Sequence, residues 1–343
     1  MATLRVGIVG AGGNTRGRHI PGLQGIPDVE IVAVCNRSHE SGAKVATEFG
    51  IPDVMTDWRA LVGRDDLDAI VVGTWPYMHA PISIAALDAG KHVLCEARMA
   101  MNLAEARAML DASNRTDRVA QIVPSPMMFT WDAVIRQQVD AGLLGEVREI
   151  HIRGLSGASV DPASPISWRQ RDDLSGLNIM NLGIVYECLA RYFGHVATVS
   201  AVTRVWNAKR PDPDEAGGER RVGVAETAQV LAEMESGALA VFQFSGIAAH
   251  AGPSRAEVYG SAGTLVLEFG PENVRAGRTS DEALHDVELP AAMKGGWRVE
   301  EDFVDSIRTG APVTLTSFEE GIRYMEFTEA VHHSATSGRR VHV

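Results

Sequence analysis

Residues 4–15 read LRVGIVGAGGNT, and this stretch decides the fold. Leu4–Val9 is a short apolar run, which is typical of a strand buried inside a parallel sheet. The glycines that follow it allow a tight turn and bring backbone N–H groups toward a pyrophosphate at a helix N-terminus. A Gly-x-Gly is weak evidence alone, but after a buried strand that opens a βαβ unit it strongly indicates a dinucleotide site.

Strands and helices alternate along the first 123 residues. Further apolar runs predict strands at 30–35, 69–73, 91–95 and 119–123. Helical patterns fall between them, at 18–24, 41–49, 58–62, 80–89 and 103–113. Such alternation predicts a parallel sheet with right-handed crossovers. We therefore expect residues 1–123 to form an α/β Rossmann domain.

The pattern changes after residue 123. Strands of alternating polarity are expected at 147–153, 196–206, 225–234, 239–245, 255–259 and 264–268, with few helices between them. Helices are expected at 131–141, 297–309 and 318–336, and an exposed loop at 207–223. Residues 124–343 are thus predicted to be an α+β domain with an open, mostly antiparallel sheet, for substrate binding and oligomerisation.

Composition narrows the classes of partner. A length of 343 residues suits two domains, and a formal net charge of −12 argues against a nucleic-acid surface. Cys35, Cys95 and Cys188 lie in apolar runs, and we expect free, buried thiols in a reducing compartment. No apolar run reaches membrane-spanning length and no signal peptide precedes the first strand, which predicts a cytoplasmic protein. No spacing of His, Cys, Asp or Glu indicates a metal site.

Residues 90–96, GKHVLCE, resemble the GKHVLCEKP signature of the glucose-fructose oxidoreductase / inositol dehydrogenase (Gfo/Idh/MocA) family. The stretches at 143–147, 256–268 and 329–341 are also similar to text in that family. The resemblance implies an NAD(P)-dependent oxidoreductase that acts on a sugar, polyol or related hydroxy compound. It also implies a homodimer or homotetramer that pairs through the open sheet.

The end of the second strand bears on the choice of nicotinamide. NAD sites place Asp or Glu there, which accepts from the ribose 2′-hydroxyl, whereas this chain has Asn36, Arg37 and Ser38. Arg37 can pair with a 2′-phosphate and stack on adenine, so NADP is favoured. NAD stays possible if Arg37 points to solvent.

The resemblance assigns more residues to the cofactor. Thr74 to His79 match a TPNxxH stretch that lines the nicotinamide side, and Glu96 matches the Glu of EKP. Compared with the family, this chain has one extra residue before His19, so the glycine turn is expected to be wide. Arg16 in this turn is expected to face either the phosphates or solvent. The expected cofactor-binding residues are Gly10, Gly12, Gly13, Asn14, Thr15, Arg16, Asn36, Arg37, Ser38, Thr74, Trp75, His79 and Glu96.

The proton-transfer groups of the family are replaced. Ala97 stands where the family has the catalytic Lys, and Arg98 where it has Pro. In the second motif, Asn181, Val185 and Cys188 replace Asp, His and Asp. The remaining candidates for substrate binding are Arg98, Trp168, Arg169, Asn178 and Asn181. The candidates for proton transfer are Tyr186, Glu187 and His79, each of which has a packing role as its alternative.

Two other functions stay open. The cofactor can act without net redox change, through transient oxidation followed by elimination or hydrolysis. The chain can also be a non-catalytic nucleotide-binding regulator, similar to the galactose-regulon repressor that resembles this family. Steady-state production of NADPH separates redox turnover from the first of these alternatives, which produces none.

Overall fold

The computed structural model describes residues 2–343, which divide into two compact units. Of the described residues, the first unit holds those up to 124 and 298–325, and the second holds 125–297 and 326–343. The expected boundary near residue 123 differs from this division by one residue. The segment 298–325, expected in the second domain, belongs to the first unit because α9 (Val299–Thr309) packs against α1 (Ile20–Gln24) there.

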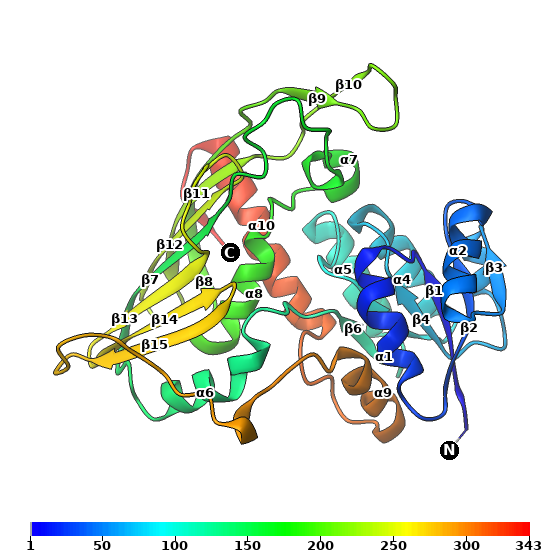
Figure 1. The fold of residues 1–343 in the computed structure, drawn as a ribbon, viewed down its shortest axis with the longest axis horizontal. Coiled ribbons are helices and arrows are strands. Elements are labelled where there is room, and N and C mark those ends of the chain that lie inside the picture. Colours follow the sequence, from blue (N-terminus) through cyan, green and yellow to red (C-terminus); the bar gives the residue numbers. More distant parts are fainter. Residues whose placement is uncertain (1) are drawn as a thin grey trace. The chain divides into compact units, whose positions relative to one another are not determined.

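The first unit is built on a six-stranded parallel sheet, in the order β3-β2-β1-β4-β5-β6 (Figure 1). This is the Rossmann order, and it confirms the predicted fold class. The strands are β1 (Leu4–Val9), β2 (Val29–Cys35), β3 (Asp53–Met55), β4 (Ala69–Val72), β5 (His92–Cys95) and β6 (Ala120–Ile122). The sequence analysis missed β3, because three half-buried residues make no apolar run.

Helices connect these strands, and side-chain caps set where several of them begin. Ser38, Asp57 and Asn102 each accept a backbone N–H of the first turn that would otherwise lack a partner. Besides α1 and α9, the helical segments of this unit are η1 (Thr15–His19), α2 (His39–Phe49), α3 (Trp58–Val62), η2 (Pro76–Met78), α4 (His79–Asp88) and α5 (Leu103–Ser113). The helix α10 (Phe318–Ser337) begins in the first unit and ends in the second.

The second unit is built on a nine-stranded sheet in the order β16-β15-β14-β13-β7-β12-β11-β8-β17. Only the neighbours β7 and β12 run parallel among the described strands of this sheet, so the predicted, mostly antiparallel sheet is confirmed. Its strands are β7 (Val147–Leu155), β8 (Val196–Arg204), β11 (Thr227–Met234), β12 (Leu239–Ser245), β13 (Arg255–Gly260), β14 (Gly263–Phe269), β15 (Glu272–Arg278), β16 (His285–Asp286) and β17 (Val341–His342).

One face of this sheet is covered by α8 (Leu182–Phe193) and the second half of α10 (Figure 1). Tyr186 of α8 stacks on Phe327 of α10 with ring centroids 4.1 Å apart, and both rings contact Phe242 of β12. The strands alternate buried and exposed residues, so their other face carries the side chains that α8 and α10 leave uncovered. The remaining helical segments are η3 (Phe129–Trp131), α6 (Asp132–Asp140), η4 (Trp168–Gln170), α7 (Asp172–Ser175) and η5 (Ala291–Met293).

Residues 207–223, expected to be an irregular loop, contain a short hairpin. Its strands β9 (Lys209–Pro211) and β10 (Glu219–Arg221) pair antiparallel. These two strands could not be predicted from the polar sequence, because their side chains bury little apolar area. Among residues 2–343, no helix combines the length and the apolar character needed to cross a membrane.

Candidate functional site

A pocket of about 330 Å³ lies at the carboxyl ends of β1, β2 and β4. In an open α/β sheet, ligands bind at this edge where the strand order reverses, which here is between β1 and β4. Six of the predicted cofactor residues line the pocket, namely Gly10, Gly12, Asn36, Arg37, Thr74 and Trp75. Tyr77 and Met78, from the stretch expected to line the nicotinamide side, also line it, together with Ser41, Thr56, Trp58 and Ile82, which were not predicted.

Glycine is required at the start of the turn that follows β1. Gly10 has a φ of +88°, and a Cβ there would lie 2.8 Å from the backbone nitrogen of Thr74. The Oδ1 of Asn36 accepts the N–H of Ala11 at 2.9 Å, and the hydroxyl of Thr15 donates to the carbonyl of Gly10. Asn36, just after β2, and Thr15 therefore both hold the glycine turn in place.

The charge and hydrogen-bonding groups of this pocket come from few of its residues. Among its lining residues, all within the described chain, Arg37 is the one charged side chain and none is acidic. The guanidinium of Arg37 lies over the Trp75 ring, 5.1 Å from its centroid. The hydroxyl of Thr74 is buried and has no hydrogen-bond partner among residues 2–343, so it is available to a bound group.

The residue inserted before His19 is taken up by a π-helix. Thr15–His19 form η1, whose wider turn accommodates one more residue than an α-helix. His19 lies at the end of η1 with its Nε2 2.9 Å from Glu96 and its Nδ1 2.5 Å from Glu300. Asn14, in the glycine turn, donates to the same oxygen of Glu96. The sequence analysis placed Asn14 and Glu96 at the cofactor but missed the pairing with His19 and Glu300.

The charges in this cluster stabilise one another. Burial by itself would lower the pKa of His19, but the hydrogen bonds and negative charges of Glu300 and Glu96 outweigh it and raise that pKa to about 9. Burial opposes ionisation of Glu96, yet its hydrogen bond and ion pair with His19 lower its pKa overall. At neutral pH, a buried imidazolium thus lies between two carboxylates.

Other predicted cofactor residues have different partners. The guanidinium of Arg16 forms an ion pair with Glu48 of α2 at 2.5 Å, so Arg16 is directed to Glu48 and not to the glycine turn. The hydroxyl of Ser38 accepts the N–H of Ser41 at 3.3 Å and thereby caps α2. Gly13 is exposed and helical, directly before η1.

His79 is fully buried at the start of α4. Its Nδ1 lies 2.7 Å from the carbonyl oxygen of Arg98, and its Nε2 lies 3.0 Å from that of Thr74. Burial lowers its pKa, and a neutral ring donates to one of these carbonyls at a time. This geometry favours a role in tying α4 to the segment after β5 over the predicted proton transfer. Arg98, a predicted substrate residue, is itself buried.

The second unit contains a pocket of about 320 Å³ that has both apolar and polar lining residues, and it is called the polar pocket here for its polar side chains. It brings together Arg169 and Asn181, two of the predicted substrate residues, with hydroxyl and amide side chains that the sequence analysis did not single out. Trp168 lies beside it, with the guanidinium of Arg169 4.3 Å from its ring centroid. The additional polar residues that line the pocket are Ser156, Ser159, Ser167, Gln170 and Glu226. Asn178 is buried, and its amide donates to the carbonyl of Ser175.

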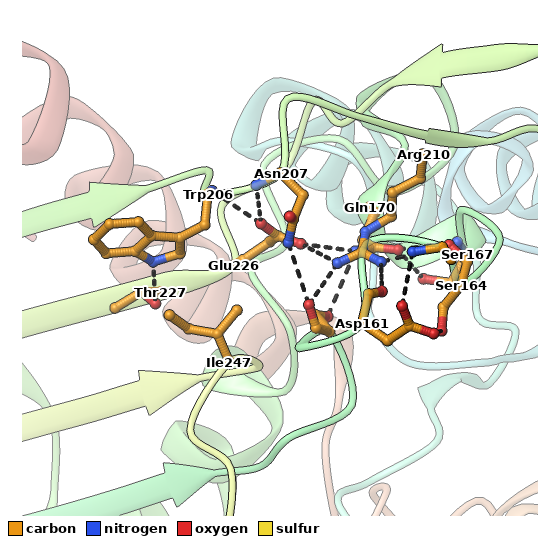
Figure 2. Close-up of polar contacts among 12 residues, drawn as sticks. Asp161, Ser164, Ser167, Gln170, Trp206, Asn207, Arg210, Glu226, Thr227 and Ile247 are labelled. Atoms are coloured by element: carbon orange, nitrogen blue, oxygen red, sulfur yellow. Dashed lines mark hydrogen bonds and ion pairs between the residues drawn. The ribbon is translucent and has the colours of Figure 1, made fainter.

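Glu226 anchors one wall of this pocket, and Figure 2 shows its contacts. Its carboxylate accepts from Arg210 at 2.9 Å and from Gln170 at 3.2 Å. The backbone N–H groups of Trp206 and Asn207 donate to its other oxygen. Burial would raise the pKa of Glu226, but these hydrogen bonds lower it overall. The pair could not be predicted, because Arg210 lies in the polar segment that was expected to be an exposed loop.

The predicted proton donors on α8 are engaged in packing and ion pairing. Tyr186 is buried against Phe327, and its hydroxyl lies 3.2 Å from Nδ1 of His195. The carboxylate of Glu187 accepts from Arg191 at 2.7 Å and from the N–H of Ser125 at 2.8 Å. This geometry favours structural roles for both residues. Within residues 2–343, no three His, Cys, Asp or Glu side chains gather in a way that could hold a metal ion.

Two family models match the chain. Residues 4–123 match the model described as an oxidoreductase family with an NAD-binding Rossmann fold. Residues 133–266 match the C-terminal domain model named GFO/IDH/MocA.

Named relatives match as well. A dTDP-3,4-didehydro-2,6-dideoxy-alpha-D-glucose 3-reductase of Streptomyces antibioticus is 28% identical over 96% of both chains. A levoglucosan dehydrogenase of Pseudarthrobacter phenanthrenivorans is 29% identical over 54% of this chain, and the match spans 48% of that relative.

Solved structures have the same fold. An oxidoreductase domain protein from Kribbella flavida has a TM-score of 0.86 at 26% identity, with both chains covered completely. A levoglucosan dehydrogenase in complex with NADH and L-sorbose has a TM-score of 0.88 at 24% identity, with 99% of both chains covered.

Proposed function

The chain belongs to the Gfo/Idh/MocA family of oxidoreductases, and we propose that it is an NADP-dependent enzyme acting on a CH–OH group of a sugar, polyol or related hydroxy compound. The relatives support this class of reaction. They are named as a dehydrogenase and a reductase of sugar-like compounds, and the solved levoglucosan dehydrogenase was obtained with NADH.

The preference for NADP rests on the charge of the cofactor pocket. An acidic residue at the end of β2 would repel a 2′-phosphate, and the lining residues within the described chain include none. Arg37 supplies a guanidinium with donors for the phosphate and a plane that stacks on rings, as its position over Trp75 illustrates.

Different residues of the first unit bind different parts of the cofactor. The backbone N–H groups of the turn from Gly10 to Gly12 suit the pyrophosphate, and Thr74 offers its free hydroxyl. When bound, the nicotinamide supplies the hydride acceptor or donor. Glu96, ionised and fixed by His19 and Asn14, keeps a negative charge at the end of β5.

The polar pocket of the second unit supports a hydroxylated substrate. Serine hydroxyls and the side chains of Gln170 and Asn181 both donate and accept hydrogen bonds, as sugar hydroxyls require. Arg169 adds a donor that suits a carbonyl or carboxylate on such a compound. Tyr186, Glu187 and His79 were the residues predicted for proton transfer in place of the family's Lys, and their contacts favour structural roles instead.

The experiment that tests the cofactor is a fluorescence titration with NADPH and NADH. We expect tighter binding of NADPH, and we expect Arg37→Ala to weaken NADPH about tenfold or more while it changes NADH by about threefold or less. Arg115→Ala is the matched control, because Arg115 is an exposed arginine paired with Asp88 outside the pocket. Equal losses for both cofactors in Arg37→Ala would contradict the NADP assignment.

Substrate turnover is tested by absorbance at 340 nm with NADP and a panel of hexoses, anhydrosugars and hexitols. Net NADPH formation supports the oxidoreductase. The alternatives, cofactor-assisted elimination or hydrolysis and a non-catalytic regulator, both predict no net NADPH. They are less favoured, because the named relatives are a dehydrogenase and a reductase.

We also infer a homodimer or homotetramer. Val202, Leu231 and Leu239 are 65%, 62% and 59% exposed on neighbouring strands β8, β11 and β12. Exposed apolar side chains on three neighbouring strands, with Gln229 and Glu233 paired opposite Val202 and Leu239, suit a self-complementary interface. The free, buried thiols of Cys35, Cys95 and Cys188 support a reducing compartment such as the cytoplasm.

A further inference from the structure

We propose that protonated His19 is a positioning residue of the cofactor site, which holds the glycine turn against the end of β5 and offsets the negative charge beside it, so that dinucleotide affinity depends on its proton. The inference rests on the proposed function, because it assumes that this site binds a dinucleotide.

The contacts of His19 connect three parts of the first unit. One ring nitrogen lies 2.9 Å from Glu96 at the end of β5, and the other lies 2.5 Å from Glu300 in the first turn of α9. Both ring nitrogens carry a proton only in the imidazolium form. Only the charged ring therefore donates to both carboxylates at once. His19 is completely buried, and loss of either contact leaves a buried carboxylate with fewer donors.

Asn14 transmits the state of this cluster to the cofactor turn. It lies between Gly13 and Thr15, and its amide donates to the same oxygen of Glu96 that His19 binds. The π-helix places Asn14 and His19 so that both reach that oxygen. A neutral His19 would leave Glu96 free to shift, and Asn14 would lose its fixed partner, although Asn36 still holds Ala11 at the other end of the turn.

The net charge of the cluster also favours dinucleotide binding when His19 is protonated. With His19 protonated, the cluster with Glu96 and Glu300 carries one net negative charge, and deprotonation raises this to two. A second buried negative charge near the turn disfavours an anionic pyrophosphate. Glu96 also interacts with His79 on α4, but burial lowers the pKa of His79, so His79 is neutral when His19 titrates.

The test measures NADPH affinity by fluorescence at pH values from 7 to 10. In the wild type we expect the dissociation constant to be flat up to about pH 8 and to rise about tenfold as the pH passes 9, where His19 loses its proton. We expect His19→Gln to bind NADPH about tenfold more weakly at pH 7 and to lose this pH dependence. His92→Gln is the matched control, because His92 is also buried in this sheet, at the other end of β5.

A second variant keeps the inference open to test if His19→Gln does not fold. Glu300→Gln leaves the contact of His19 with Glu96 but removes one of the two charges that raise the pKa of His19. The rise in the NADPH dissociation constant should then move to lower pH. A purely structural role for His19 predicts no such movement.

The outcomes separate the inference from the proposed function. If the wild type binds neither NADPH nor NADH at millimolar concentration, the proposed function falls and this inference falls with it. If the wild type binds NADPH while His19→Gln keeps the same affinity and pH profile, or Glu300→Gln keeps the wild-type midpoint, only the role of His19 is overturned.

Discussion

Arg210 and Glu226 form an ion pair at 2.9 Å in which each side chain is only 1% exposed. The pair joins the β9 segment to the start of β11, beside the polar pocket of the second unit. The nitrogens of Arg210 also donate to the carbonyls of Asp161 and Ser159, so the pair holds the segment between β7 and η4 in place (Figure 2).

Removal of one partner should be costly, because it leaves the other charge buried without compensation. We expect Glu226→Gln and Arg210→Met each to lower the free energy of unfolding by about 3 kcal/mol. Urea unfolding followed by tryptophan fluorescence measures this, with Trp206 as a reporter whose backbone N–H binds Glu226. The control is Lys44→Gln, which breaks an exposed pair with Glu40 and should cost less than about 0.5 kcal/mol. Similar losses at both sites would show that burial does not strengthen the pair.

The stability of the first unit should fall at alkaline pH. The pKa of His19 rises from 6.5 to about 9 on folding, so its contribution is complete below about pH 6.5 and is lost as the pH rises through 9. The shift corresponds to about 3 kcal/mol. The measurement is the difference in unfolding free energy between the wild type and His19→Gln from pH 6 to 10. A difference that stays constant over this range would contradict the charged state of His19.

Gly22 should tolerate no side chain, although it lies inside α1. A Cβ there would lie 2.8 Å from the carboxylate of Glu300, which is fully buried and bound to His19. We expect Gly22→Ala to destabilise the chain by about 2 kcal/mol, because Glu300 must move. Gly17→Ala is the control, since a Cβ at Gly17 has no neighbour within 4 Å. It should be neutral or slightly stabilising, as Ala favours helix. Thermal unfolding of both variants decides the point.

The parts of the fold with strong local patterns could be predicted from the sequence. The strand Leu4–Val9 and the helix Leu103–Ser113 were expected at their observed bounds, because the first is a continuous apolar run and the second has helical spacing of apolar residues. The strand Asp53–Met55 and the pairing of Lys209–Pro211 were missed, because short, half-buried or polar segments carry no such pattern.

The candidate site was predictable where its residues lie next to the strand ends. Arg37 and Thr74 each lie two residues after the end of a strand, β2 and β4, so chain order alone indicated them. Glu300 lies 281 residues from His19, and an acidic residue near a helix start is commonplace, so no local signal linked them. The insertion before His19 was visible as irregular spacing, but its consequence depends on the π-helix that absorbs it.

Tyr186→Phe tests whether α8 supplies the proton-transfer group. The variant keeps the stack on Phe327 and loses the hydroxyl contacts with His195 and with the N–H of Val196. We expect a loss of about 1 kcal/mol in stability and no change in kcat on the best substrate of the panel. Asn181→Ala is the comparison, and it should raise KM because Asn181 lines the polar pocket. A fall in kcat of about a hundredfold in Tyr186→Phe would restore Tyr186 as a catalytic residue.

The exposed apolar side chains on β8, β11 and β12 predict that the chain self-associates through this face of the large sheet. Leu231 lies on β11 between the buried residues Val230 and Ala232, so its side chain points away from the face that α8 and α10 cover. A charge on this face should oppose self-association, because it would be buried without a partner in a symmetric interface. We expect Leu231→Glu to convert the oligomer to monomers in sedimentation velocity, with the fold retained by circular dichroism. Val160→Glu, an equivalent change at an exposed apolar residue outside the sheet, should leave the assembly intact. A wild type that sediments as a monomer, or a Leu231→Glu variant that keeps the wild-type mass, would rule out this face as the interface.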